Sequence, residues 1–576
     1  RNALEARFEK FGSADLKNIS LPMDLFRIVL PWEPGTKMAA APPANVSKKS
    51  PVALFIALLA TIGLLCGVWW LVERSKRDHN NSLTNSAKLV PAAEVKAPDQ
   101  NSVAVLPFVN LSDDKGSEYF SDGVSEELLT VLQKIPGLHV AARTSAFSFK
   151  GKNSTAQEIG QKLGVAHLVE GSVRRSGNSV RIAARLSRVD TGEELWSENY
   201  TRDLKDVFAV QTELAQTIVA QLRGRFARAD ADSTAKEKIL AEVQAAAKGG
   251  TKNIEAHEAY LQGRFFINRH SEKETEQARA AFQHAVELDP TFALAWAGLA
   301  QTHIWFCNYV TAGGQKGFNA HLAAARDAVE KALALEPELP EALSARSVIE
   351  TNFDYNLKGA AETLRKALAL APEDSTLLTE AGNFAAVRGD LMQAQELLRR
   401  AVTVDPVNAL ARAVYASSLQ SSGHYAEARL EYERVIELNP SAPNSHASIG
   451  LCYLLEGKPE AAIAAAQQDA ADWAQLLVVS SARWSQKRVT ESDAALNELI
   501  AKNGETAAYQ IAEVYGYRDD KDHAFEWLER ARRQHDAGLL GLRVDTLLPN
   551  LHSDTRWNAF LHTMGLADDQ LKVSQR

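Results

Sequence analysis

The chain has 576 residues, enough for three or four domains, and its 45% hydrophobic and 24% charged residues are ordinary for globular proteins. A net charge of −8 without a strongly basic block makes nucleic acid a poor candidate partner. The three cysteines, Cys66, Cys307 and Cys452, provide no disulfide framework.

Residues 1–34 contain two short apolar runs on either side of Pro22, a pattern typical of a β-hairpin. The string FEKFGSADLKNISLPMDLFRIVLPW resembles the last strands of the class III adenylate/guanylate cyclase catalytic domain. The carrying positions are Phe8, Phe11-Gly12, Leu16-Lys17-Asn18-Ile19, Pro22 and Phe26-Arg27-Ile28. Because the chain starts at Arg1, we expect it to continue a longer protein.

The resemblance implies that the catalytic and metal-binding residues of such a cyclase lie upstream of this hairpin. We therefore expect no catalytic, cofactor-binding or metal-binding residue in this chain. Mg²⁺ and ATP or GTP are expected only for the missing catalytic core.

Residues 52–72 (VALFIALLATIGLLCGVWWLV) are 21 consecutive residues without a charge. A helix of this length spans about 31 Å, the thickness of the hydrocarbon core of a bilayer. A buried core helix rarely runs this long without a charge, and a cleaved signal peptide does not fit 51 preceding residues. The stretch predicts a single transmembrane helix that contacts lipid.

Gly63 and Gly67 form a GxxxG sequence in this stretch, which lets two helices approach closely and predicts a dimer contact. Three basic residues flank the stretch closely on each side, so the positive-inside rule does not orient it.

Residues 102–226 predict a small α/β domain, with strands at Val103–Phe108 and Leu138–Ala142 and a helix at Glu118–Gln133. A capping box (Thr155 and Glu158) opens a second helix, and Gly164 is placed to end it. Turns at residues 176–178 and 190–192 separate the later strands. Along the middle strand one face is expected to carry Val180, Ile182, Ala184 and Leu186, and the other Arg181, Arg185 and Ser187.

The phrases VAVLPF, EYFSDGVSEELLTVL, EIGQKLGVAHLVEGSV and VRIAARLSRVDTGEELWSENY resemble the amino-terminal domain of TolB proteins. The resemblance implies an interaction or ligand-sensing module without enzymatic chemistry. Acidic residues here suggest a metal site, but a solvated loop and helix N-terminal carboxylates explain them better. The residues concerned are Asp113, Asp114, Asp122, Glu126 and Glu127. His139 and His167 each stand alone and are interpreted as surface or packing residues.

Residues 251–566 repeat one phrase that ends in Pro290, Pro337, Pro372, Pro406 and Pro440. The last three intervals match the tetratricopeptide period, so the region resembles an array of these helix pairs. Small residues are expected where the two helices of a pair cross, namely Ala278, Ala325, Ala360, Ala394, Ala428, Ala285, Ala332, Ala367, Ala401 and Val435. Residues 310–318 carry an insertion, expected in a turn, and the last 30 or so residues resemble a terminal cap.

Such an array implies a protein or peptide partner on its concave face, lined by first helices that include Trp296, Asn383 and Tyr415. The predicted fold class is multidomain, with a single transmembrane helix, a small α/β TolB-like domain and an all-α repeat solenoid. The boundaries are 1–34 cyclase hairpin, 35–50 linker, 51–73 membrane helix, 74–101 linker, 102–226 α/β domain, 227–250 linker and 251–566 repeats.

The order of these parts resembles a bacterial class III cyclase, and we expect this chain to be its sensory and protein-interaction arm. That function predicts a cytoplasmic N-terminus at the inner membrane and places residues 74–576 in the periplasm. Two alternatives stay open: a membrane-bound scaffold without enzymatic role, and a transmembrane transcription regulator of the winged-helix type. Residues upstream of Arg1 would discriminate between them.

Overall fold

In the computed structural model, the chain divides into two compact units, residues 1–96 and residues 97–576. The residues that the structure describes are 7–14, 23–29, 99–204, 207–223, 233–269, 271–309, 314–440 and 442–571.

The first unit contains the hairpin predicted from the sequence. Strand β1 (Arg7–Ala14) pairs antiparallel with β2 (Met23–Val29), and Arg7 lies opposite Val29. The register shifts between Lys10 and Gly12, which marks a bulge in β1. The local hairpin is therefore confirmed, whereas a cyclase domain is not shown.

The predicted fold class is wrong in its transmembrane helix. Within the described ranges, no helix combines the length and the apolarity needed to cross a membrane. The longest described helix, α10 (Gly314–Leu335), carries charged residues such as Arg326, Asp327 and Lys331, which suit an amphipathic packed helix. The stretch 52–72, with Gly63 and Gly67, lies outside the described residues. The description that the structure supports is a mostly helical protein with one small α/β region.

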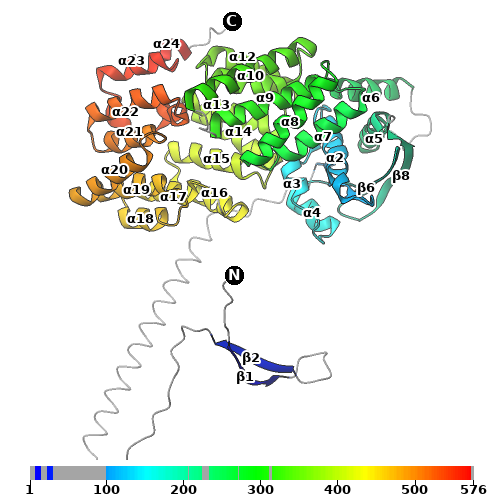
Figure 1. Ribbon diagram of the computed structural model, residues 1–576, viewed down its shortest axis with the longest axis horizontal. Helices are drawn as coiled ribbons and strands as arrows, with labels where there is room; N and C mark the ends of the chain where they lie inside the picture. The colour runs from blue at the N-terminus through cyan, green and yellow to red at the C-terminus, as the bar shows by residue number, and fades with distance from the viewer. Residues whose placement is uncertain are drawn as a thin grey trace, which may run out of the picture. The chain divides into compact units, whose positions relative to one another are not determined.

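The α/β region is a mixed sheet with helices packed around it (Figure 1). Its strand order is β5-β3-β6-β7-β8, and β4 also pairs with β6. The pairs β3–β5, β3–β6 and β4–β6 are parallel. The pairs β6–β7 and β7–β8 are antiparallel. The strands are β3 (Ser102–Val105), β4 (Val109–Asn110), β5 (His139–Val140), β6 (His167–Ser176), β7 (Ser179–Arg188) and β8 (Glu194–Asp203). The helices are α2 (Glu118–Gln133), α3 (Arg143–Phe147), α4 (Ala156–Leu163) and α5 (Val207–Leu222).

Local sequence signals in this region are confirmed. Thr155 and Glu158 form the reciprocal capping box of α4, and Gly164 ends that helix in the left-handed conformation with φ of 66°. Along β7 the predicted apolar face is buried, while Ser187 is buried rather than exposed. At this point the register of β7 and β8 shifts: Leu186 lies opposite Trp196 and Ser187 opposite Glu194, so Leu195 forms a bulge in β8.

Antiparallel helix pairs follow from residue 254 onward (Figure 1). The pairs are α7 (Ile254–Ile267) with α8 (Glu272–Leu288), α9 (Ala293–Tyr309) with α10, α11 (Pro340–Asn352) with α12 (Leu357–Leu370), α13 (Ser375–Val387) with α14 (Leu391–Val404), α15 (Ala409–Ser421) with α16 (Tyr425–Leu438), α17 (Ser445–Leu455) with α18 (Pro459–Ala466), α19 (Asp472–Ser485) with α20 (Val489–Asn503), and α21 (Ala508–Tyr517) with α22 (Lys521–Gln534). The stretch expected to be a linker before them carries helix α6 (Ser233–Ala246).

The expected small residues lie in the helix crossings. All nine predicted alanines are fully buried and Val435 is nearly so, as the repeat register requires. Glycine serves the same purpose in the first helices. A Cβ on Gly263 or on Gly298 would lie 2.6 Å from the Phe282 ring, so these glycines make room for a buried aromatic side chain.

The extra residues before Pro337 lengthen helices instead of forming only a loop. Helix α9 runs to Tyr309 and α10 already begins at Gly314, so residues 314–318 of the expected turn are helical. Residues 310–313 lie outside the described ranges.

The C-terminal cap comprises η3 (Ala537–Val544), η4 (Pro549–Leu551), α23 (Thr555–Thr563) and α24 (Asp568–Leu571). Its buried Leu548, Trp557 and Phe560 share one apolar cluster with Leu364 and Phe384 from the middle of the array. In Figure 1 the red cap accordingly lies beside green α12 and α13. The cap therefore covers the last helix pair and also joins it to the third and fourth pairs.

Candidate functional site at the junction of the α/β region and the repeats

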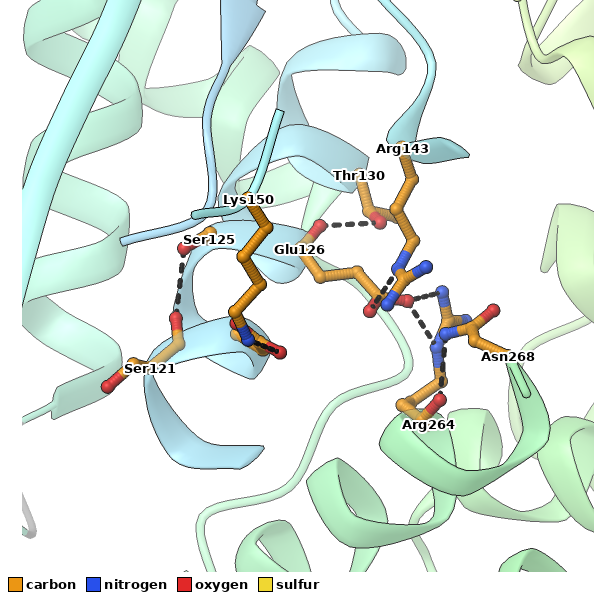
Figure 2. A network of polar contacts seen from close by, with 9 residues as sticks. Ser121, Ser125, Glu126, Thr130, Arg143, Lys150, Arg264 and Asn268 are labelled. Carbon is orange, nitrogen blue, oxygen red and sulfur yellow. Dashed lines mark hydrogen bonds and ion pairs between the residues drawn. The ribbon is translucent and has the colours of Figure 1, made fainter. Parts of the chain in front are cut away.

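The α/β region and the repeats meet where α2 packs against α7, and Glu126 is the centre of this junction. Glu126 is only 4% exposed. It accepts hydrogen bonds from Arg143 Nε at 2.6 Å and from Arg264 Nε at 2.8 Å. Figure 2 shows the two guanidinium groups converging on this carboxylate from different parts of the chain.

The charge of Glu126 is held by its two partners. Burial opposes ionisation of this carboxyl group, but the charges of Arg264 and Arg143 outweigh that effect and lower its pKa. A buried carboxylate with two guanidinium partners fixes the orientation of helices while it remains paired.

A second ion pair stands one turn earlier on α2. Lys150 donates to both carboxylate oxygens of Asp122, at 2.8 and 2.6 Å. Burial raises the pKa of Asp122, and the bond and charge of Lys150 partly offset this rise. Ser125 donates to the Ser121 carbonyl at 2.9 Å (Figure 2). It also accepts from the amide of Phe108 at 2.8 Å, which ties α2 to the residue before β4.

Further contacts extend the junction to the first turn of α11 and to the turn that precedes α15. Lys134 pairs with Glu341 of α11 at 2.9 Å, and Ser145 donates to Asp405 at 2.6 Å. The amide of Ala142 donates to the Val404 carbonyl at 3.4 Å. The α/β region is thus fixed to α7, to the start of α11 and to the turn before α15, so it bridges repeats that are distant in sequence.

A cleft of about 390 Å³ remains between these contacts, and we call it the junction cleft. Residues of α2 and α3 form one wall, and residues of the first helices α7, α9, α11 and α13 form the other. Its apolar lining includes Ile267, Ile304, Trp305 and Val348, and its acidic lining includes Glu341, Asp374, Glu380 and Asp405.

Burial raises the pKa of three acidic residues that line the junction cleft, Glu380, Asp374 and Asp405. Burial raises the pKa of Glu380 to about 7, although Ser344 donates to its two oxygens at 2.8 and 2.9 Å. Burial also raises the pKa of Asp374 and of Asp405, despite the hydrogen bonds that each accepts. Burial therefore favours the neutral form of these three carboxyl groups, whereas the cations of the same cleft, Lys134, Arg143 and Arg264, are paired with Glu341 and Glu126.

The structure places the sequence-predicted residues in several environments. Asp113 and Asp114 lie in an exposed loop, as expected, but Asp122 and Glu126 are buried in ion pairs instead of being solvated. His139 is exposed and His167 is buried, which agrees with their interpretation as surface and packing residues. Within the described ranges, no group of three or more His, Cys, Asp or Glu side chains is arranged to hold a metal ion.

Residues named for the concave face do not line the junction cleft. Trp296 donates its indole N–H to the Pro290 carbonyl at 2.9 Å, Asn383 is exposed, and Tyr415 lies on α15 beyond the cleft. Other residues of the first helices, such as Trp305, Ser344 and Glu380, form its wall. In the sequence, these cleft residues can be recognised only as the polar or partly exposed positions that alternate with buried positions along each first helix.

Comparisons with known proteins support the repeats. A family model described as tetratricopeptide repeat matches residues 415–475, which run from α15 into α19. This chain contains tetratricopeptide repeats.

Similar solved structures include YrrB, described as a TPR protein with an unusual peptide-binding site. It is 19% identical, the match covers 38% of this chain and 98% of that chain, and the TM-score is 0.26. PilF of Pseudomonas aeruginosa is 22% identical, the match covers 37% of this chain and 90% of that chain, and the TM-score is 0.29. The human IFIT1 dimer with m7Gppp-AAAA is 15% identical, the match covers 57% of this chain and 87% of that chain, and the TM-score is 0.36.

Among curated proteins, a putative adenylate cyclase 3 of Rhizobium meliloti (strain 1021) is 38% identical over 203 residues. The match covers 35% of this chain and 32% of the relative, so it spans about a third of that protein's length.

Proposed function

We propose that this chain is the sensory and protein-interaction arm of a class III adenylate/guanylate cyclase. The observation that carries the proposal is the 38% identity over 203 residues with a putative adenylate cyclase. The terminal hairpin β1–β2, whose sequence resembles the end of such a catalytic domain, is consistent with this origin.

The repeats supply the interaction surface. Tetratricopeptide arrays present their first helices to a partner segment, and the junction cleft lies on the first helices of four consecutive pairs. Glu380 lines this cleft, and the hydrogen bonds that it accepts there come from the neutral Ser344 hydroxyl. A lysine or arginine of the partner segment that reached Glu380 would favour its ionised form by pairing with it.

The junction supplies a route by which binding can affect the rest of the protein. Glu341 of the cleft pairs with Lys134 of α2, and Arg264 of the cleft pairs with Glu126 of the same helix. A partner that changes either pair alters how α2 is held against α7. The TolB-like resemblance of the α/β region, which implies an interaction or sensing module, fits this position.

The test uses the longest natural form of the protein, and measures cyclic AMP and cyclic GMP formed from ATP and GTP. We expect activity there and none from residues 1–576 alone. Glu380→Lys should change the response of that activity to a bound partner, and Glu396→Lys, at an exposed pair on α14, serves as the control. A natural form without cyclic nucleotide synthesis would support the scaffold alternative instead.

A further inference from the structure

A second cavity, which we call the α2–α7 pocket, adjoins the junction cleft, and both are lined by Glu126, Lys134 and Arg264. Its volume is about 370 Å³, within the range of small-molecule sites. Helix α2, the end of α6 with the following loop, α7 and the start of α9 line it. Its apolar walls include Leu128, Val131, Val243, Leu261, Phe292 and Leu294.

The pocket opens to solvent beside Ala247, Lys248 and Lys252, so a small molecule can enter it without unfolding of the protein. An apolar cavity of about 150 Å³ already accommodates benzene, so the α2–α7 pocket has room for a larger ring system.

Glu127 is one of the polar residues that line the pocket, and its carboxylate is held in a fixed position. Its carboxylate accepts hydrogen bonds from His257 Nε2 at 2.7 Å and from Gln211 Nε2, so two side chains hold it in place. His257 is 3% exposed, which means that this support is itself buried. A carboxylate offers about four acceptor positions, so capacity remains for a donor from a ligand.

The cationic groups near the pocket have other partners or lie at its mouth. Arg264 is paired with Glu126, and Lys134 is paired with Glu341. Lys248 and Lys252 are exposed at the rim. The interior therefore presents an acceptor with apolar surroundings, which favours a neutral ring with one N–H or O–H donor and disfavours an anion.

We propose that the α2–α7 pocket binds a small neutral aromatic molecule through its apolar walls and one hydrogen bond to Glu127. This site goes beyond the proposed interaction with a protein partner. Because it touches α2 of the α/β region and α7 of the repeats, its ligand would stabilise the contact between them.

The test is isothermal titration calorimetry of residues 1–576 with indole as the donor-bearing probe, 1-methylindole as the probe without a donor, and indole-3-acetate as the anionic probe. We expect saturable 1:1 binding of indole. Affinity for 1-methylindole should be about tenfold lower or more, because a hydrogen bond to a charged acceptor is lost. Indole-3-acetate should also bind more weakly than indole.

Two variants locate the binding. Ala247→Trp places a large side chain at the exposed rim of the pocket and should abolish indole binding without disturbing the fold. Glu127→Ala should remove the preference for indole over 1-methylindole. Glu276→Ala, an exposed acidic residue on α8, should change neither result. Absence of saturable indole binding, equal affinity for indole and 1-methylindole, or full binding by a folded Ala247→Trp variant would each overturn the proposal. None of these outcomes depends on cyclic nucleotide synthesis or on a protein partner.

Discussion

Ser145 of α3 donates a hydrogen bond to Asp405, which lies 260 positions later in the turn before α15. Asp405 is 1% exposed and also accepts from Asn408 at 3.0 Å and Ser375 at 3.3 Å. One buried carboxyl group thus joins the α/β region to two successive turns of the array.

Replacing Ser145 with alanine should weaken this joint. A buried acceptor loses one donor, so we expect a loss of about 1–2 kcal/mol in the free energy of unfolding. Urea denaturation measures the loss, and hydrogen exchange should show faster opening at residues 142–146. Ser148→Ala is the matched control, because the Ser148 hydroxyl donates to the nearby Ser145 carbonyl within the same short helix region. Equal effects of the two substitutions would contradict a special role for the Ser145–Asp405 bond.

Arg264→Ala should destabilise the protein strongly. The substitution leaves buried Glu126 with only Arg143 as a partner, and breaking a buried ion pair costs about 3–5 kcal/mol. We expect about 2–4 kcal/mol by urea denaturation because one guanidinium remains. Arg279→Ala, which removes an i,i+3 pair on the surface of α8, should cost less than about 1 kcal/mol. A loss no larger than that of the control would mean that Glu126 finds water or another donor.

Glu380→Gln should change the pH dependence of stability. In the folded chain burial raises the pKa of Glu380 to about 7, whereas an unfolded glutamate titrates near about 4.3. The folded state therefore holds the proton more tightly, and stability from this group is lost as pH rises from about 4.3 through 7. Glutamine does not titrate, so the variant lacks this loss of stability. Between pH 4 and pH 8 its free energy of unfolding should rise by about 1–3 kcal/mol relative to that of the natural chain.

Thermal unfolding at pH 4, 6 and 8 measures that difference. Glu396→Gln, at an exposed pair, is the control and should leave the pH profile unchanged. Parallel profiles for Glu380→Gln and the natural chain would show that Glu380 titrates as an ordinary surface carboxyl group.

Ala394→Arg should disrupt the fourth helix pair. Ala394 is fully buried in the crossing of α13 and α14, where an arginine brings both excess volume and an unpaired charge. Each effect costs about 1–3 kcal/mol or more, so the Tm should fall by many degrees. Met392→Arg, two residues away and 85% exposed, should leave the Tm nearly unchanged. An unchanged Tm for Ala394→Arg would show that the repeat register is wrong.

Gly263→Ala tests close packing between repeats. Alanine favours a helix over glycine by about 1 kcal/mol, but the added Cβ would lie 2.6 Å from the Phe282 ring. Overpacking costs about 1–3 kcal/mol, so we expect net destabilisation. In a Phe282→Leu background the substitution should become neutral or stabilising, and Gly541→Ala, where a Cβ has no close neighbour, is the control. A stabilising effect in the natural background would show that the ring moves freely.

Local features of the fold could be predicted from the sequence because they depend on residues that are near in the chain. The capping box at Thr155, the glycine end of α4 at Gly164 and the alanines of each helix pair follow from hydrogen bonding and side-chain size within one or two helices. The burial of Ser187 did not follow from the alternation of side chains along β7, and helix α6 lies within the region expected as a linker.

The transmembrane helix was wrong for a different reason. An uninterrupted apolar stretch reports only the hydrophobicity of a segment, and the helices within the described part of the chain are amphipathic and pack against one another. The cyclase and TolB resemblances rest on sequence phrases, which carry no information about how the parts of a protein meet.

Sequence by itself determined the helix pairs and the small α/β region, since periodicity and turn residues specify elements and their nearest neighbours. Only the tertiary structure decided that Arg143 and Arg264 meet on Glu126, and that the C-terminal cap packs against the third and fourth helix pairs. The contact at Glu126 depends on how α2 of the α/β region packs against α7, and the contact of the cap depends on the curvature of the array. Small rotations between successive repeats add up over many helices, and their sum decides which distant residues come into contact.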